Sequence, residues 1–348
     1  MTTHELDGDT ATLLMRTLLG RTISADEVQR VGWERLAAIA RQNGILLRIA
    51  GCIEAGRLTM PALVDLAVAG ERQRAAAALG IVRRVSEICT AHGVPFLFPK
   101  ALQHLPDMGS DLDLLVGTRS TAIDDALVRE LGGTAVRSNL IGRIAGTATY
   151  SIPGGPPLDI QHGRLGAVGE HVAFPAALLA HSRPCIIDGV TFLVPSADDQ
   201  LVLQGMQRVY GRRRIRLSDI IYTVSTISGD SLDWDYIIAQ ARLAGILRGL
   251  SCYVSYVDQV HLELMGHPLL DAPVAARLSL AGWGRLEFRG GFYRYPVVRV
   301  SARVYPPILS ALLRGGNWSA AGRLCLVPFL GMASAIRYRA GPSARANA

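Results

Sequence analysis

Apolar residues at helical spacing dominate the first quarter of the chain. From residue 10 to residue 88 they recur every three to four positions among Ala and Arg residues. The last helix of this series is expected over residues 71–90, because a His-Gly pair that can end it follows shortly afterwards. This pattern predicts an N-terminal helical region covering residues 1–90.

Short apolar runs replace this pattern after Gly93. Alternating or continuous apolar residues bounded by Gly and Pro are typical of strands. A turn or short helix is expected to begin at Lys100 and to end at Pro106, and a helix over residues 121–131 has Ser120 as its N-cap. The expected strands cover residues 94–98, 111–116, 145–152 and 158–161, with a hairpin around Asp188-Gly189.

Helical spacing returns after Ser196. Helices are expected over residues 198–209, 218–228 and 234–244. The sequence therefore predicts an α+β fold in which a small mixed sheet is flanked by N-terminal and C-terminal helical regions. The expected division is a helical region at 1–90, an α+β core at 91–200, a helical domain at 201–287 and an Arg-rich C-terminal region at 288–348.

The positive charge of the chain is concentrated in its last 61 residues. The net charge is +7, but residues 288–348 contain nine arginines and no Asp, Glu or Lys, so residues 1–287 carry −2. Such a region could bind nucleic acid, an anionic membrane surface or an acidic partner, or it could keep an apolar helical segment soluble. The apolar run at 324–336 contains Pro328 and is shorter than the roughly 20 residues of a transmembrane helix, so membrane contact would be peripheral.

Cysteine use and the N-terminus indicate a cytoplasmic protein. The five cysteines are widely spaced, odd in number and without metal-ligand spacing, which favours reduced thiols. The N-terminus is polar and acidic and lacks the basic and apolar segments of a secretion signal.

The segment from Lys100 to Val116 contains the most specific chemistry. Asp111 and Asp113 alternate with leucines in a predicted strand, so both carboxylates point to one face. Like charges in an apolar strand need a neutralising cation, and Mg²⁺ prefers such oxygen ligands. Lys100 is the only lysine in a chain with 35 arginines, which marks it as a candidate for phosphate binding.

A third carboxylate, Asp159, lies in the predicted strand at 158–161. Two carboxylates on one strand and a third on its neighbour can hold two metal ions about 4 Å apart and promote in-line phosphoryl displacement. We therefore expect Asp111 and Asp113 to bridge two Mg²⁺ ions, and Asp159 to bind the second ion and accept a proton from the acceptor hydroxyl. The candidate nucleotide-binding residues are Lys100, Gly109, Ser110, Arg212 and Arg216.

Other polar motifs receive structural interpretations. Asp233-Trp-Asp235 has the same spacing as the acidic strand, but it opens a predicted helix, where acidic residues suit the helix dipole. The arginines at 212–216 are expected either to line an anion pocket or to begin a solvated helix. Asp219 is expected either to face the cleft or to pair with these arginines. His162 should point to the face opposite the carboxylates.

Three segments resemble the uncharacterised nucleotidyltransferase family of the polymerase-β-like superfamily. They are Gly-Val-Pro-Phe-Leu-Phe-Pro-Lys-Ala-Leu at 93–102, Gly-Ser-Asp-Leu-Asp-Leu-Leu-Val at 109–116 and Leu-Asp-Ile-Gln-His at 158–162. Residues 212–219 also resemble the family's basic stretch ahead of a helical Asp, and residues 232–235 resemble its later acidic-Trp element, so the similarity covers roughly residues 30–260. Ala101 stands where the family has Gly, Gln161 stands where it has His, and the Arg that commonly precedes the acidic strand is absent.

The resemblance implies Mg²⁺-dependent transfer of a nucleotidyl group from an NTP, with ATP the leading candidate. The acceptor would offer a hydroxyl or phosphate on a small molecule, a sugar or a natural-product peptide. One alternative is an RNA acceptor bound by the C-terminal arginines. The other is a non-catalytic protein of the same fold that binds a nucleotide or a partner.

Overall fold

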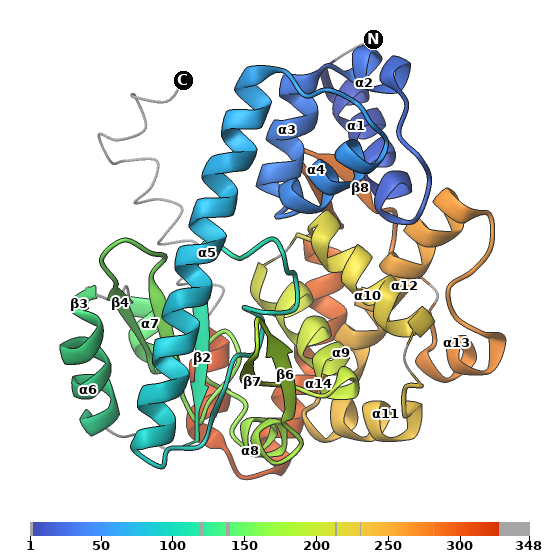
Figure 1. Ribbon diagram of the computed structural model, residues 1–348. Helices are drawn as coiled ribbons and strands as arrows, with labels where there is room; N and C mark the ends of the chain where they lie inside the picture. The colour runs from blue at the N-terminus through green and yellow to red at the C-terminus, as the bar shows by residue number, and fades with distance from the viewer. Residues whose placement is uncertain are drawn as a thin grey trace, which may run out of the picture.

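The computed structural model describes residues 3–117, 121–136, 140–212, 214–229, 231–280 and 282–326. The described residues form an α+β structure in which helices surround one mixed sheet (Figure 1). All five cysteines are free thiols, and two of them, Cys89 and Cys252, are buried. Ser120 and most of the apolar run at 324–336 lie outside the described residues.

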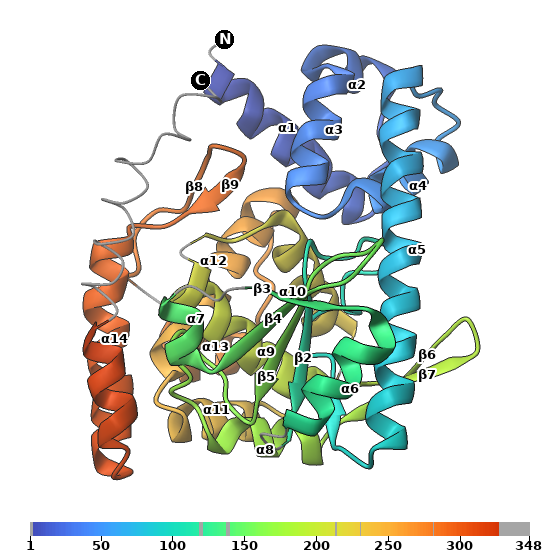
Figure 2. The same ribbon diagram turned by 90° about the vertical axis from the view of Figure 1, so that its left-hand side faces the viewer.

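The N-terminal region is helical, as predicted. Its last helix is 30 residues long and runs along one side of the molecule from the other N-terminal helices to α6 (Figure 2). Ser24 and Glu27 form a capping box that fixes the start of the second helix. The five helices are α1 (Thr3–Leu18), α2 (Ala25–Val31), α3 (Trp33–Gln42), α4 (Leu46–Ala55) and α5 (Ala62–Ala91).

A five-stranded sheet follows, with the strand order β1-β2-β5-β4-β3. Strands β2 and β5 are parallel and the other neighbouring pairs are antiparallel, so the sheet is mixed. The segment from Lys100 to Pro106 forms turns, which is one of the two structures expected there. The elements of this part are β1 (Phe96–Leu97), β2 (Leu112–Val116), α6 (Thr121–Leu131), β3 (Thr134–Val136), α7 (Leu140–Ala145), β4 (Thr147–Ser151) and β5 (Leu158–His162).

The two faces of the sheet contact different hydrophobic clusters. Leu112, Leu114 and Ile160 face a smaller core shared with α5 and α6. Leu115, one residue along β2 from Leu114, belongs to the larger core of the helical part. Since alternate strand residues face opposite sides, Asp113 shares the face of Leu115 and lies between the sheet and the helices. This placement puts polar strand residues under helical cover.

A hairpin and a short helix connect the sheet to the later helices. Asp188 and Gly189 have φ angles of 49° and 75°, which identifies the predicted two-residue turn as a type that needs positive φ at both positions. The Phe98 amide donates to the Leu193 carbonyl at 3.1 Å and joins the hairpin to the end of β1. These elements are α8 (Ala173–Ala180), β6 (Arg183–Ile187) and β7 (Val190–Val194).

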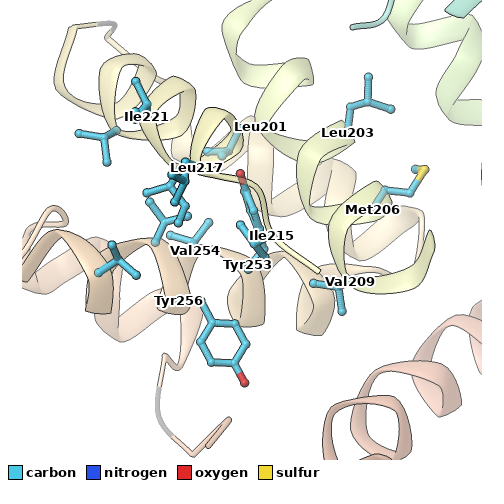
Figure 3. Packing of buried hydrophobic residues seen from close by; sticks show 14 of the residues in the cluster. Leu201, Leu203, Met206, Val209, Ile215, Leu217, Ile221, Tyr253, Val254 and Tyr256 are labelled. Carbon is cyan, nitrogen blue, oxygen red and sulfur yellow. The ribbon is translucent and has the colours of Figure 1, made fainter. Parts of the chain in front are cut away.

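The helices after Ser196 pack around the larger core (Figure 3). Tyr253 and Tyr256 are almost fully buried within it. Gly249 has no room for a side chain, because an added Cβ would come within 2.2 Å of the Tyr210 ring. These helices are α9 (Ala197–Gly205), the π-helix η1 (Met206–Arg212), α10 (Leu217–Gly229), α11 (Trp234–Leu243), α12 (Leu247–Met265) and α13 (Ala272–Leu278).

The C-terminal region packs on the same core as far as the structure describes it. It contains β8 (Glu287–Arg289), β9 (Phe292–Arg294) and α14 (Val297–Arg314), whose buried face includes Val300 and Val304. Arg303 and Arg323 donate to backbone carbonyls, so these two arginines have packing roles. Within the described residues, none of the helices has both the length and the apolar composition that crossing a membrane requires.

Candidate active site

The three predicted carboxylates come from two neighbouring strands. Asp113 and Asp159 are direct partners in the register of β2 and β5. Because these strands are parallel, partner residues point to the same face, and the two carboxylates lie side by side. Asp111 precedes β2 by one residue and is offset by two from Asp113, so it extends the same acidic row.

Asp113 is the most enclosed of the three and has two cationic or polar partners. The Lys100 Nζ lies 2.7 Å from its Oδ2, and the Gln161 amide donates to its Oδ1 at 3.1 Å. Only 17% of the Lys100 side chain and 9% of the Asp113 side chain are exposed. An ion pair in such surroundings needs both partners, because removal of either leaves a poorly solvated charge. The sole lysine therefore belongs to the carboxylate site.

A hydrogen bond orients the Asp159 carboxylate, and the negative charges of its neighbours disfavour its ionised form. The Thr149 hydroxyl, from the adjacent β4, donates to its Oδ1 at 2.6 Å. Burial raises the pKa of Asp159, and the charges of Asp113 and Asp111 raise it further against the opposing effects of Thr149 and Lys100. The carboxylates on this sheet face thus carry more negative charge than Lys100 and Thr149 compensate.

Asp111 lies at the end of this row in a more open position. The Ser110 hydroxyl donates to its Oδ1 at 3.2 Å, and the Arg212 Nη2 lies 3.7 Å from its Oδ2. The Asp111 side chain is 30% exposed and the Arg212 side chain is 45% exposed, so this contact is weak in water. Arg212 ends η1, and it brings the helical part of the chain to the acidic row.

The donor atoms of the site are of the kind that Mg²⁺ prefers. The available donors are carboxylate, hydroxyl and amide oxygens, and the buried Oε1 of Gln161 has no hydrogen-bond partner among the described residues. With the side chains in their present orientations, no group of three or more His, Cys, Asp or Glu residues in the described ranges lies close enough to hold a metal ion. Asp113 turns toward Lys100, and Asp111 turns toward Ser110 and Arg212.

A cavity of about 210 Å³, here the small cavity, covers Asp113 and Asp159. Lys100, Gln161 and Arg212 also line it, so it contains both signs of charge. The loop at 165–167 lies against the small cavity.

This loop is fixed from two directions. The Glu170 carboxylate accepts the amides of Ala167 and Val168, at 3.2 Å and 2.9 Å. Arg323 donates to the carbonyls of Val168 and Gly169, so a residue of the C-terminal region supports a wall of the small cavity. Gly166, at φ 105°, leaves no room for a residue with a side chain, because an added Cβ would lie 2.2 Å from the Glu170 carboxylate.

Two residues that the sequence did not identify hold the segment before β2. Asp107, which is 1% exposed, accepts the amides of Leu47 and Arg48 at the start of α4. Arg74 of α5 donates to the carbonyls of Met108 and Gly109 at 2.9 Å and 2.7 Å. This chain lacks the Arg that the family commonly has just before the acidic strand, and Arg74, which is distant in sequence, supports that segment instead.

The remaining predicted residues have separate positions. A second cavity is lined by Gly109, Ser110 and Arg216. Asp219 is buried and pairs with Arg208 at 2.6 Å. His162 points away from the carboxylates and lies 3.2 Å from Asp124 of α6, as expected.

The second Asp-x-Asp motif has the predicted structural role. The Asp233 carboxylate accepts the Tyr236 amide and caps α11. Asp235 is 88% exposed and pairs with Arg277, so neither residue joins the acidic row of β2 and β5.

Comparison with known proteins identifies the family of the chain. Residues 29–261, more than half of the chain, match the family described as "Uncharacterised nucleotidyltransferase". No curated protein matches the chain. Among solved structures, the solution structure of the antibiotic-resistance factor ANT(2″)-Ia matches with 12% identity and a TM-score of 0.35, covering 46% of this chain and 86% of the other. The chain belongs to the uncharacterised nucleotidyltransferase family and is a transferase.

Proposed function

We propose that the protein transfers a nucleotidyl group from an NTP, with ATP the leading candidate, to a hydroxyl or phosphate oxygen of an acceptor in a Mg²⁺-dependent reaction. The observation that carries this proposal is the register pair of Asp113 and Asp159 on one sheet face, with Lys100 in contact with Asp113. A carboxylate row beside a cationic side chain suits a triphosphate and divalent ions. A purely structural strand would have no need of three carboxylates under helical cover.

The carboxylates of Asp111, Asp113 and Asp159 would hold Mg²⁺, with the unpartnered Oε1 of Gln161 as a further oxygen donor nearby. Bound there, Mg²⁺ would neutralise the negative charge that develops on the phosphate oxygens. Lys100 and Arg212, which both line the small cavity, would bind and orient the phosphates.

In the transfer step the acceptor oxygen forms a bond to the α-phosphorus while the bond to the α,β-bridging oxygen breaks. Pyrophosphate leaves, and the proton of an acceptor hydroxyl passes to the Asp159 carboxylate. The Thr149 hydroxyl, which donates to Asp159 Oδ1 at 2.6 Å, holds this carboxylate in place on the sheet face.

Label transfer from radiolabelled NTPs tests the proposal. The protein is incubated with each NTP, Mg²⁺ and a cell extract as acceptor source, and Asp113→Asn and Asp159→Asn are compared with wild type. We expect each substitution to reduce transfer at least about 100-fold, or about 2.7 kcal/mol of transition-state stabilisation. Asp235→Asn, in the chain's other Asp-x-Asp motif, is the matched control and should transfer normally. Transfer that persists in both site variants would contradict the assignment.

A further inference from the structure

A second cavity, here the large cavity, lies next to the acidic row. Its volume is about 660 Å³, within the range of small-molecule sites. Ser110, which contacts Asp111, lines the large cavity, whereas Arg212, on the other side of Asp111, lines the small one. Asp111 therefore contacts one lining residue of each cavity, and molecules bound in both cavities would approach each other near this carboxylate.

The charges that line the large cavity do not cancel. Its acidic residues are Glu71 and Asp107, and each is paired with an arginine, Arg74 and Arg48 respectively. Arg41 and Arg216 also line the cavity, and neither guanidinium has an ion pair or hydrogen bond within the part of the chain that the structure describes. After these internal pairs are taken into account, two positive charges remain for a ligand.

Arg216 is in surroundings that favour an anion. Burial lowers the pKa of its guanidinium, and Arg208, Arg212 and Arg214 lower it further, while Asp219 opposes them. Asp219 is itself committed to Arg208, at 2.6 Å, and to the Arg216 backbone amide, at 2.9 Å. A bound anion would relieve this repulsion, because it adds negative charge next to a poorly solvated cation.

The start of α10 adds hydrogen-bond donors beside Arg216. Ser218 lines the large cavity, is 2% exposed, and its hydroxyl has no hydrogen-bond partner among the described residues. The preceding Leu217 amide donates to the Asn43 side chain at 2.9 Å, which leaves Ser218 as the open position of this first turn. α10 is 13 residues long, and the N-terminus of a helix attracts anions.

We propose that the large cavity binds the acceptor through an anionic group, a phosphate monoester or a carboxylate, held by Arg216, Ser218 and the start of α10. Arg41, which is exposed, contributes at the rim. The inference rests on the proposed function and assigns Arg216 to the acceptor, whereas the sequence alone grouped it with Arg212 on the nucleotide. A hydroxyl elsewhere on the acceptor would then approach the α-phosphorus past Asp111.

Calorimetric titration with matched sugars tests the assignment. Glucose 6-phosphate, gluconate and glucose share a six-carbon chain and differ in carrying a phosphate, a carboxylate or no charge. We expect at least one anionic probe to bind wild type at millimolar concentration and glucose not to bind. Arg216→Gln should weaken that binding about 10- to 100-fold, the effect of losing a charged hydrogen bond. The exposed variant Arg41→Gln should weaken it a few-fold without disturbing the fold.

MgATP titrations of the same variants separate the two cavities. Arg212→Gln should weaken MgATP binding and leave the anionic probe unaffected, while Arg216→Gln should do the reverse. The proposal is overturned if neither anion binds better than glucose, or if Arg216→Gln weakens MgATP as Arg212→Gln does. None of these titrations requires turnover, so a protein that failed to transfer label could still show an Arg216-dependent anion site. The two failures are therefore distinguishable.

Discussion

Replacing Asp107 with alanine tests whether the segment before β2 is anchored from a distance. The buried carboxylate accepts the Leu47 amide at 2.7 Å, the Arg48 amide at 3.2 Å and the Arg48 Nε at 3.1 Å. Ile45, at the N-cap of α4, offers no side-chain cap, so Asp107 caps this helix from 60 residues away in sequence. The same bonds hold the chain that leads to Asp111.

The expected loss of stability follows from these contacts. Removing one partner of a buried ion pair costs about 3–5 kcal/mol, because the other charge is left without compensation. The unfolding entropy of a 348-residue chain is about 0.7 kcal/mol per kelvin, so Asp107→Ala should lower the unfolding midpoint by about 4–7 °C. Asp107→Asn keeps an acceptor oxygen and the side-chain shape, and should cost about 1–3 kcal/mol.

Thermal unfolding followed by circular dichroism measures this effect. The control is Glu87→Ala, which breaks an exposed pair with Arg83 and should change stability by less than about 0.5 kcal/mol. MgATP binding of Asp107→Ala, measured well below its midpoint, should also weaken, because Asp111 would lose its fixed approach to β2. If Asp107→Ala unfolds within about 1 °C of the Glu87 control, the anchor contributes nothing and the reasoning is refuted.

Three further predictions concern the site and its supports. Pyridoxal 5′-phosphate followed by borohydride should modify the Lys100 peptide, MgATP should protect it, and modification equal with and without MgATP would contradict phosphate binding there. Burial lowers the pKa of His104 well below its usual value, so its contribution to stability is present above about pH 6.5 and is lost as the pH falls below it. Urea unfolding at pH 7 and pH 5 should show His104→Gln losing less stability than wild type, and equal losses would exclude the effect. Arg323→Gln frees the carbonyls of Val168 and Gly169 and should raise the KM for the NTP a few-fold, and a rise in KM for the acceptor alone would place this loop elsewhere.

The elements that local signals define were predictable from the sequence. The period of two in the acidic strand placed Asp111 and Asp113 on one face, because side chains alternate along any strand. The helix predicted at 121–131 coincides with α6, and the positive φ angles at Asp188 and Gly189 match the turn that this pair favours. In each case the deciding interactions lie within a few residues of one another.

The division of the site into two cavities could not be predicted, because it depends on distant contacts. Arg212 and Arg216 are four residues apart and looked like one basic cluster. Between them, Ile215 exchanges backbone hydrogen bonds with Tyr293, at 2.9 Å and 3.1 Å. This bridge from the C-terminal region separates the end of η1 from the start of α10, and the two guanidiniums face different cavities. No local sequence pattern near Ile215 indicates that it pairs with Tyr293, 78 positions later.

Several supports of the carboxylates lie within residues 29–261, the range that matches the family. Three carboxylates on one strand pair repel one another, and β4 and β5 supply the hydrogen-bond donors Thr149 and Gln161 but no Lys or Arg. Arg48 at the start of α4 holds Asp107, Arg74 of α5 holds the carbonyls before Asp111, and Arg212 at the end of η1 reaches Asp111 itself. Tyr253 of α12 donates to the backbone of α10, which orders the segment after η1. A sheet without these helices would keep the partners of Asp113 and Asp159 but would lose those that position Asp111 and the segment before β2, so the complete site requires the helices as well as the strands.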